Sequence, residues 1–305
     1  MVKYILAATA LKCFSAGPQM RGLYRGLGNL AGGRRRSSGK IPSYYLERIK
    51  RLLHLQREYN LVRNGDRIIE IGTGWLHWEA ITTRLFFDVE AVLFDVWDNR
   101  QLIGLKNYVG QLTSILGTSD FDLSSAELKR AQSLIQAIVK VNSFRELYRL
   151  LGFEYLVESS GSLRQLPANS FQLVASGGVL EHVTREDVSS LVSEMQRVLK
   201  PGGWSLHSID TQDHLSYYDA RVSRKMYLAF SDRTWRSVFE NRVQYINRLQ
   251  RSEWIELFKT AGFELIDEDS WYTDLGQIKL AERFAKMDRH DLECTGPRFL
   301  HSKPA

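Results

Sequence analysis

The 305-residue sequence has little of what holds small or unusual proteins together. It contains only two cysteines, Cys13 and Cys294, which lie far apart and match neither a zinc nor a disulfide spacing. Its six prolines are scattered, and no apolar run approaches the ~20 residues that a membrane-spanning helix needs. At 44% hydrophobic and 25% charged residues, the composition is that of an ordinary folded protein. A disulfide scaffold, a disordered chain and a multi-span membrane protein are excluded.

Acidic residues are absent before Glu47, and eight basic residues precede it. The rest of the chain has 33 basic against 35 acidic residues, so the formal net charge of +6 divides into +8 and −2. A near-neutral body argues against a nucleic-acid-binding domain with a basic face, and we expect no nucleic-acid partner. The eight basic residues are Lys3, Lys12, Arg21, Arg25, Arg34, Arg35, Arg36 and Lys40.

Residues 1–42 form this basic leader, and three interpretations of it stand. The apolar run at 4–11 ends at Lys12, and most of the charge follows it, which is the reverse of a secretory signal. The leader is then an ordinary terminal helix with a solvated loop, a segment lying on an anionic membrane surface, or an Arg-rich transit peptide. We expect a cytoplasmic location, with peripheral membrane contact under the second interpretation.

Apolar periodicity over residues 43–305 alternates between strands and helices. A helix-rich insert at about 99–151 interrupts this alternation, and no internal repeat or low-complexity tract occurs. Alternating strands and helices indicate a doubly wound α/β sheet. We expect strands at 67–71, 90–94, 154–158, 171–176, 203–209, 263–268 and 297–302, and helices at 43–60, 75–87, 184–199 and 252–261.

The loop Gly72-Thr73-Gly74 follows the first predicted strand and precedes a helix. Glycines let a backbone approach a ligand, and a helix start offers free N–H groups. Asp95 closes the next strand, where a carboxylate accepts hydrogen bonds from ribose hydroxyls. A dinucleotide fingerprint would need glycine at position 77, which is His77, and the phosphate-binding pattern G-x-x-x-x-G-K-[ST] is absent. A cofactor with ribose but no phosphate fits this loop better.

Five motifs occur in an order that resembles class I S-adenosylmethionine-dependent methyltransferases of the type 11-like group. The resemblance covers about 60–210 and implies a Rossmann-like seven-stranded sheet, with S-adenosyl-L-methionine as cofactor. The sequence departs from the family at Leu76, where a third glycine is frequent, and at Ser162, where an acid is usual. The motifs are Glu70-Ile71-Gly72-Thr73-Gly74, Asp95, Leu166–Phe171, Val179-Leu180-Glu181-His182-Val183 and Arg197–Gly203.

The same resemblance implies a role for each cofactor-binding position. Residues of the first motif would hold the amino-acid end of the cofactor, and Asp95 would bind the ribose. Two residues would lie beside the adenine, and two would line the floor near the reactive methyl together with the Leu180-Glu181-His182 segment. These positions are Glu70, Gly72, Thr73 and Gly74, then Ser162 and Leu163, then Ser176 and Gly177.

The candidate catalytic residues follow the fourth and fifth predicted strands. His182 ends the fourth, and Asp210, Asp213 and His214 come after the fifth. Ligands in a parallel sheet sit outside the carboxyl ends of the strands, and a His paired with an Asp is oriented to act as a base for a hydroxyl acceptor. A packing role for His182 stays open, and we expect His207 to be packed. The same His and Asp side chains could instead bind a metal ion, but no spacing here demands one, and the sequence predicts none.

A second insert, at about 216–250, combines aromatic and basic residues. This composition suits a sugar, an aromatic acceptor or an anionic headgroup, although a helical cap with aromatics in its core is an equal interpretation. We expect methyl transfer to a small-molecule, glycan or lipid-type acceptor, at oxygen. Two alternatives stay open: another nucleoside-cofactor enzyme on the same scaffold, such as an aminopropyl transferase or an NAD enzyme, and a cofactor-binding module without turnover. The sequence does not indicate an oligomeric state.

Overall fold

The computed structural model describes residues 1–305 and divides them into two compact units. The first unit contains 1–27, 177–196 and 206–304. The second contains 28–176 and 197–205, with the terminal Ala305. Each unit is described by itself below.

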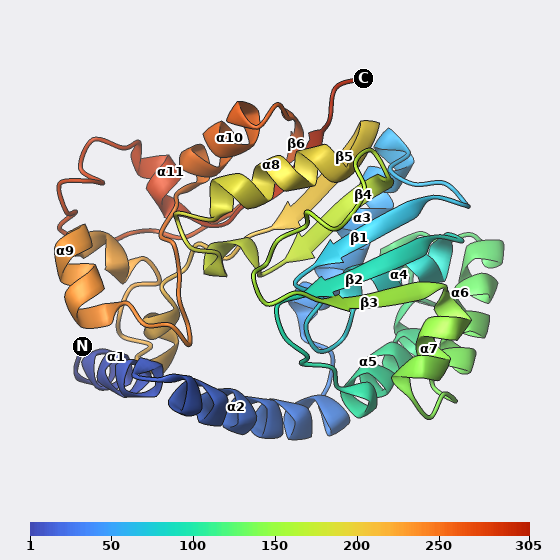
Figure 1. Ribbon diagram of the computed structural model, residues 1–305, viewed down its shortest axis with the longest axis horizontal. Coiled ribbons are helices and arrows are strands. Elements are labelled where there is room, and N and C mark those ends of the chain that lie inside the picture. Colours follow the sequence, from blue (N-terminus) through green and yellow to red (C-terminus); the bar gives the residue numbers. More distant parts are fainter. The chain divides into compact units, whose positions relative to one another are not determined.

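Seven strands are hydrogen-bonded in the order β3-β2-β1-β4-β5-β9-β6, and β7 and β8 form a separate pair (Figure 1). This α/β architecture confirms the predicted doubly wound, seven-stranded fold. The strands are β1 (Arg67–Ile71), β2 (Glu90–Asp95), β3 (Phe153–Val157), β4 (Phe171–Gly177), β5 (Leu199–Ser208), β6 (Glu264–Glu268), β7 (Trp271–Tyr272), β8 (Cys294–Gly296) and β9 (Arg298–Ser302).

The parallel strands β3, β2, β1 and β4 form the core of the second unit (Figure 1). On β1, Ile69 lies opposite Val92 of β2 and Val174 of β4, and all three side chains are buried. Runs of buried β-branched residues are typical of parallel strands that are covered on both faces. The helical elements of this unit are α3 (Ser43–Tyr59), α4 (Trp78–Phe86), α5 (Leu102–Ile115), η1 (Ser119–Phe121), α6 (Ser125–Ile138) and α7 (Phe144–Leu151).

The predicted insert at 99–151 contains α5, η1, α6 and α7. Local sequence signals set the ends of these helices. Ser124 and Glu127 form a capping box at the start of α6, each side chain bonding the other's backbone N–H. Ser143 caps α7, and Gly152 ends it in the left-handed conformation that glycine favours.

Helix α4 begins at Trp78, three residues later than the sequence pattern predicts. The reason is His77, whose φ of 51° places it in the left-handed region, so it cannot belong to a right-handed helix. Residues Trp75 to His77 therefore continue the loop that follows β1.

In the first unit, α1 (Val2–Ser15) packs into an apolar core. Tyr4, Ala8 and Leu11 recur at helical spacing and are buried. They contact the second insert, in which Tyr227 and Trp235 are also buried, whereas Tyr217 and Tyr218 are exposed. The other helical elements of this unit are α8 (Val188–Val198), η3 (His214–Tyr218), η4 (Met226–Ala229), α9 (Asp232–Thr234), η5 (Trp235–Phe239), α10 (Arg251–Thr260) and α11 (Arg289–Glu293).

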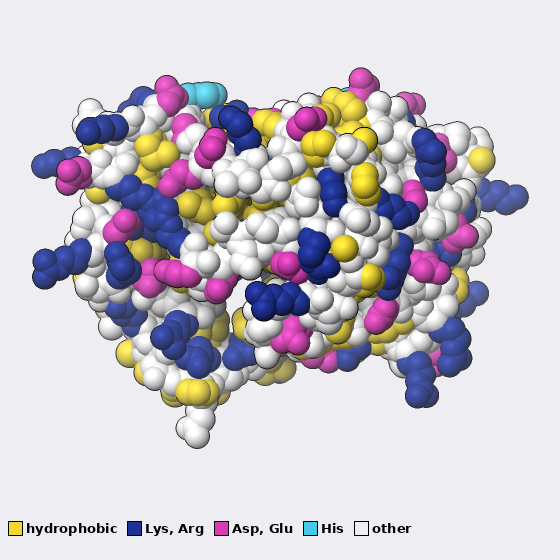
Figure 2. Space-filling view, turned by 45° about the horizontal axis from the view of Figure 1, so that its top comes forward, with side chains coloured by type: hydrophobic (Ala, Val, Ile, Leu, Met, Phe, Trp, Pro, Cys, Tyr) yellow, Lys and Arg dark blue, Asp and Glu magenta, His cyan; other side chains and the backbone are white.

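Helix α2 (Pro18–Ser38) has no buried residue. None of the helices combines the length and the apolar character that crossing a bilayer requires. The molecular face in Figure 2 carries Lys and Arg side chains interspersed with Asp and Glu.

Candidate active site

The loop between β1 and α4 adopts the backbone conformation for which its glycines are needed. Gly72 has φ 66° and Gly74 has φ 56°, values that glycine adopts without the steric cost a Cβ would add. The Thr73 N–H donates to the Phe94 carbonyl at 3.1 Å, and the Gly74 N–H donates to Asp95 Oδ2 at 2.8 Å. The structure therefore brings the predicted glycine loop and the predicted ribose-binding carboxylate together.

Asp95 is buried at the end of β2. Its Oδ1 accepts the Val96 N–H at 2.7 Å, in addition to the Gly74 contact of Oδ2. Burial raises the pKa of this carboxyl, against the lowering effect of the backbone N–H donors, and the net shift is upward. The Asp95 carbonyl also accepts the Glu158 N–H at 2.9 Å, which ties the loop containing Ser162 to the end of β2.

Glu70 is directed at the start of α4. Its carboxylate accepts the backbone N–H groups of Ala80 at 3.0 Å and Glu79 at 3.3 Å, where a helix has N–H groups without intrahelical partners. Burial, followed by the neighbouring Glu79, raises its pKa. These contacts give Glu70 a positioning role for the helix that follows the glycine loop.

The remaining predicted cofactor positions differ in exposure. Leu163 is fully buried, whereas Ser162 is partly exposed and its hydroxyl accepts the Arg164 N–H at 3.3 Å. Ser176 is buried near the end of β4, and Gly177 is the last residue of that strand.

Sequence reasoning missed a polar and aromatic group around His77. The Thr73 hydroxyl lies 2.7 Å from His77 Nδ1, and His77 Nε2 lies 3.0 Å from the Tyr148 hydroxyl. Burial, followed by the Arg100 charge, lowers the pKa of His77 to about 3, so its ring is neutral. The Arg100 guanidinium lies 4.2 Å from the centre of the Tyr155 ring. The sequence signal that could have found this group is His77 itself, which stands where a dinucleotide-binding loop has a glycine.

In the first unit, the short turn η2 (Leu180–His182) carries Glu181 and His182. Asn247 holds this turn by three hydrogen bonds. Its side-chain amide donates to the carbonyls of Leu180 at 2.9 Å and Val183 at 3.1 Å. Its backbone N–H donates to the Glu181 carbonyl at 2.8 Å. A turn bonded at three points to one buried side chain and its backbone is rigidly positioned.

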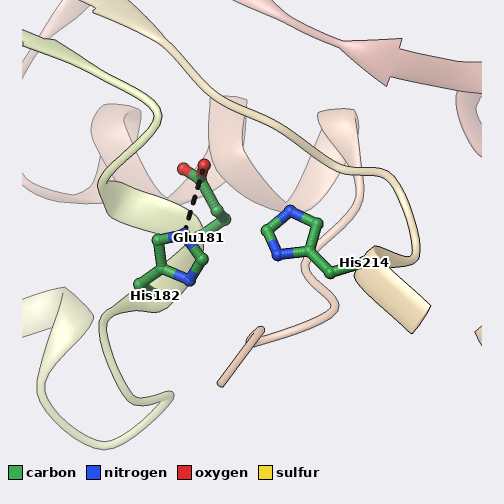
Figure 3. A group of neighbouring side chains, drawn as sticks. All are labelled: Glu181, His182 and His214. Carbon is green, nitrogen blue, oxygen red and sulfur yellow. Dashed lines mark ion pairs between the residues drawn. The ribbon is translucent and has the colours of Figure 1, made fainter. Parts of the chain in front are cut away.

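The ring of His182, on this turn, lies beside the ring of His214 (Figure 3), with ring centres 5.1 Å apart. His182 Nδ1 lies 2.6 Å from the Tyr245 carbonyl, so Nδ1 carries the proton and Nε2 is the unprotonated nitrogen. Burial, followed by the neighbouring His214, lowers the pKa of His182 to about 4.

Asp210 is the acid that pairs with His214. His214 Nε2 lies 3.3 Å from Asp210 Oδ2, and the Tyr217 hydroxyl donates to the same oxygen at 2.7 Å. Although burial opposes ionisation, the neighbouring His214 ring and the Tyr217 hydroxyl outweigh it and lower the pKa of Asp210. The structure thus places a histidine and an aspartate side by side, as the sequence predicts, and the aspartate is Asp210.

Asp213 has other partners. Its Oδ2 accepts the Tyr4 hydroxyl at 2.7 Å, and its Oδ1 accepts the Leu215 N–H at 3.0 Å at the start of η3. Burial raises the pKa of Asp213 to about 6. Asp213 therefore attaches α1 to the segment that leads into the second insert.

His207 is packed, as the sequence predicts. It is fully buried, and its ring centre lies 5.4 Å from that of Phe258. Burial, followed by the neighbouring His301, lowers its pKa to about 3.

A comparison with protein families connects this fold to an activity. The family model described as a methyltransferase domain matches residues 39–268, which is three quarters of the sequence. The chain belongs to this methyltransferase family. The predictions of an S-adenosylmethionine-dependent methyltransferase and of S-adenosyl-L-methionine as its cofactor are confirmed. No curated protein matches the chain.

Solved structures of methyltransferases are similar to this one at low sequence identity. A S-adenosylmethionine-dependent methyltransferase of Methanosarcina mazei is 16% identical, with 81% of this chain and 97% of that chain covered and a TM-score of 0.43. One from Mesorhizobium loti is 16% identical, with 82% and 97% covered and a TM-score of 0.43. Phosphoethanolamine N-methyltransferase 2 of Haemonchus contortus is 16% identical, with 83% and 52% covered and a TM-score of 0.43.

Proposed function

We propose that this methyltransferase transfers the methyl group to an oxygen atom of a small-molecule, glycan or lipid-type acceptor. The observation that carries the proposal is the polar group around His214. An alcohol gains nucleophilicity when a positioned group takes its proton, and such a group contributes about 10²- to 10⁴-fold to the rate. His214, oriented by Asp210 at 3.3 Å and facing His182, is a group of this kind.

A small pocket beside this group, large enough for about one water molecule, is lined by polar residues. Its lining residues include Glu181, Asp210, Gln212, Asn247 and Arg248. Side chains that both donate and accept hydrogen bonds suit a single hydroxyl group of an acceptor.

For the cofactor, we propose that the Gly72–Gly74 loop receives the amino-acid end and that Asp95 binds the ribose hydroxyls. Oδ2 of Asp95 holds the Gly74 N–H at 2.8 Å, so loop and carboxylate form one preorganised element. The adenine would lie beside Ser162 and Leu163, whose loop is bonded to the Asp95 carbonyl through Glu158.

The test is transfer of radiolabelled methyl groups from S-adenosylmethionine to fractions of a cell extract. We expect label in an ether product, in which the methyl carbon is bonded to oxygen, and a loss of about 10²-fold or more in His214→Ala with unchanged affinity for S-adenosylhomocysteine. His54→Ala is the matched control because His54 is exposed and lies in the other unit. Label found only on nitrogen contradicts the oxygen assignment, and full activity of His214→Ala contradicts the role of His214 as the base. Cofactor binding without any transfer would instead identify a binding module.

We also propose that α2 contacts an anionic membrane surface, where a lipid-type acceptor would be encountered. Met20, Leu23, Leu27 and Leu30 recur at helical spacing on one face and are exposed, Leu30 by 57%. The helix carries five arginines and no acidic residue, and each basic residue near such a surface contributes ~1 kcal/mol.

Point substitutions test this contact better than removal of the leader, because α1 contributes Tyr4 and Leu11 to a core. In Leu23→Asn/Leu27→Asn we expect loss of co-sedimentation with phosphatidylserine-containing vesicles, with cofactor affinity retained. Ile103→Asn, which changes an exposed apolar residue outside α2, is the control. Equal sedimentation of all three proteins contradicts the proposal.

A further inference from the structure

We propose that Glu181, His182 and His214 bind a divalent transition-metal ion. One ligand atom from each of these side chains lies within 4.8 Å of the other two (Figure 3). Two imidazoles and one carboxylate form a donor set that suits zinc and related ions and leaves coordination positions open. Glu181 and His214 are buried, so this is a built site and not a chance grouping of surface side chains.

His182 presents the correct nitrogen for a metal. Its Nδ1 donates to the Tyr245 carbonyl at 2.6 Å, and its Nε2 lies 3.9 Å from Glu181 Oε1. Histidines that ligate metals characteristically donate their second N–H to a backbone carbonyl or a carboxylate, which fixes the tautomer and the ring orientation. The lone pair of Nε2 is therefore on the side of Glu181.

In His214 the ring nitrogen that would not bind the metal lies beside a carboxylate instead of a backbone carbonyl. Its Nε2 lies 3.3 Å from Asp210 Oδ2, and its other ring nitrogen is turned toward His182 (Figure 3). Asp210 is itself held by the Tyr217 hydroxyl at 2.7 Å, and the Tyr217 ring stacks on His214 with centres 5.4 Å apart. A carboxylate behind a histidine raises the basicity of the ligating nitrogen.

The ligand atoms of the three side chains need to move only slightly closer together to bind one ion. Two ligands of a tetrahedral zinc ion with bonds of about 2.1 Å lie about 3.4 Å apart. The separations of up to 4.8 Å therefore shrink by side-chain rotation, while the turn stays fixed by Asn247. A fourth position would open toward the pocket that Glu181, Asp210 and Gln212 line.

The role of the cation rests on the proposed function, whereas its binding does not. A metal ion lowers the pKa of a coordinated hydroxyl, as it does that of coordinated water. The acceptor O–H bond would break with loss of its proton to water, and the oxygen would form a bond to the methyl carbon as the sulfonium C–S bond breaks. His182 and His214 would then be ligands, and the cation would replace the imidazole as the activating group.

The experiment is calorimetric titration of Zn²⁺ into the full-length, chelator-treated protein without methyl donor or acceptor. We expect one ion per chain, and an affinity reduced by at least 10-fold in each of Glu181→Gln, His182→Ala and His214→Ala. Asp210→Asn should weaken binding by 10- to 100-fold through His214. His54→Ala, which changes an exposed histidine in the other unit, should leave the affinity unchanged.

Co²⁺ titration of the unmodified protein provides a second measurement that needs no variant. A visible absorption band of a four- or five-coordinate nitrogen and oxygen site should appear and saturate at one equivalent. Absence of saturable binding of both ions, or binding that the three ligand substitutions leave unchanged, overturns the proposal. Binding of Zn²⁺ by a protein that transfers no methyl group would leave the metal site intact and contradict only the proposed function.

Discussion

The buried amine of Lys225 predicts a pH dependence of stability. Lys225 is fully buried, and its Nζ donates to the carbonyls of Thr211 at 3.1 Å and Cys294 at 2.7 Å and to the Gln250 side-chain oxygen at 2.9 Å. These partners are neutral oxygens. Burial lowers the pKa of Lys225 from its ordinary 10.5 to about 7, because neutral dipoles replace the water around the charge only in part.

The direction of the effect follows from proton counting. Between about pH 7 and 10.5 the unfolded chain binds a proton at Lys225 that the folded chain has released, so the free energy of unfolding rises with pH in this window. Integration of the two titration curves from pH 7 to pH 9 gives about 2 kcal/mol. Well below pH 7 both states hold the proton, and the contribution becomes constant at its least favourable value.

The assay is urea unfolding at pH 7, 8 and 9 of the native protein and of Lys225→Met, which retains the length of the side chain. The informative quantity is the change with pH and not the absolute stability, since the variant also loses the hydrogen bonds of Nζ. We expect the native protein to gain about 2 kcal/mol more than Lys225→Met over this range. Parallel changes in the two proteins would show that Lys225 keeps an ordinary pKa when folded, and would refute the reasoning.

Three further substitutions test other contacts. Asp95→Ala should lower the affinity for S-adenosylhomocysteine at least 10-fold in calorimetry, since it removes both the proposed ribose contact and the bond to Gly74; unchanged affinity contradicts that role. Tyr4→Phe should reduce the free energy of unfolding by about 1–3 kcal/mol because Asp213 loses a buried donor, whereas Tyr218→Phe, at an exposed position, should have little effect. Asn247→Ala should slow methyl transfer without weakening cofactor binding, because the turn carrying His182 loses two bonds; equal rates would contradict a positioning role.

The strands of the sheet were predictable from the sequence because strands buried on both faces consist of short runs of apolar residues. The segments 67–71 and 90–94 are short runs of apolar and β-branched residues, and they form β1 and β2 with bounds that agree to one residue. Helix starts were less predictable. The late start of α4 depends on the left-handed backbone of His77, which Thr73 and Tyr148 hold by side-chain contacts that no local pattern encodes.

The cofactor loop was partly predictable, because its contacts are between neighbouring strand ends. Gly74 and Asp95 follow adjacent parallel strands, and the bond between them is what that topology favours. Glu70 shows the limit of the same reasoning: its identity was recognised, but its bonds to Ala80 and Glu79 depend on where α4 begins.

The two acids near His214 show why the candidate catalytic group required the structure. From the sequence alone, Asp210 and Asp213 are equally good candidates for the acid beside His214, since both follow β5 and both are close to His214 in the chain. Asp213 is the residue before η3, and its side chain turns back to accept the Leu215 N–H, which directs it away from the His214 ring and toward Tyr4. Asp210 precedes that turn and is free to lie beside His214 Nε2. The start of one short helical turn therefore decides which acid orients the histidine and which attaches α1.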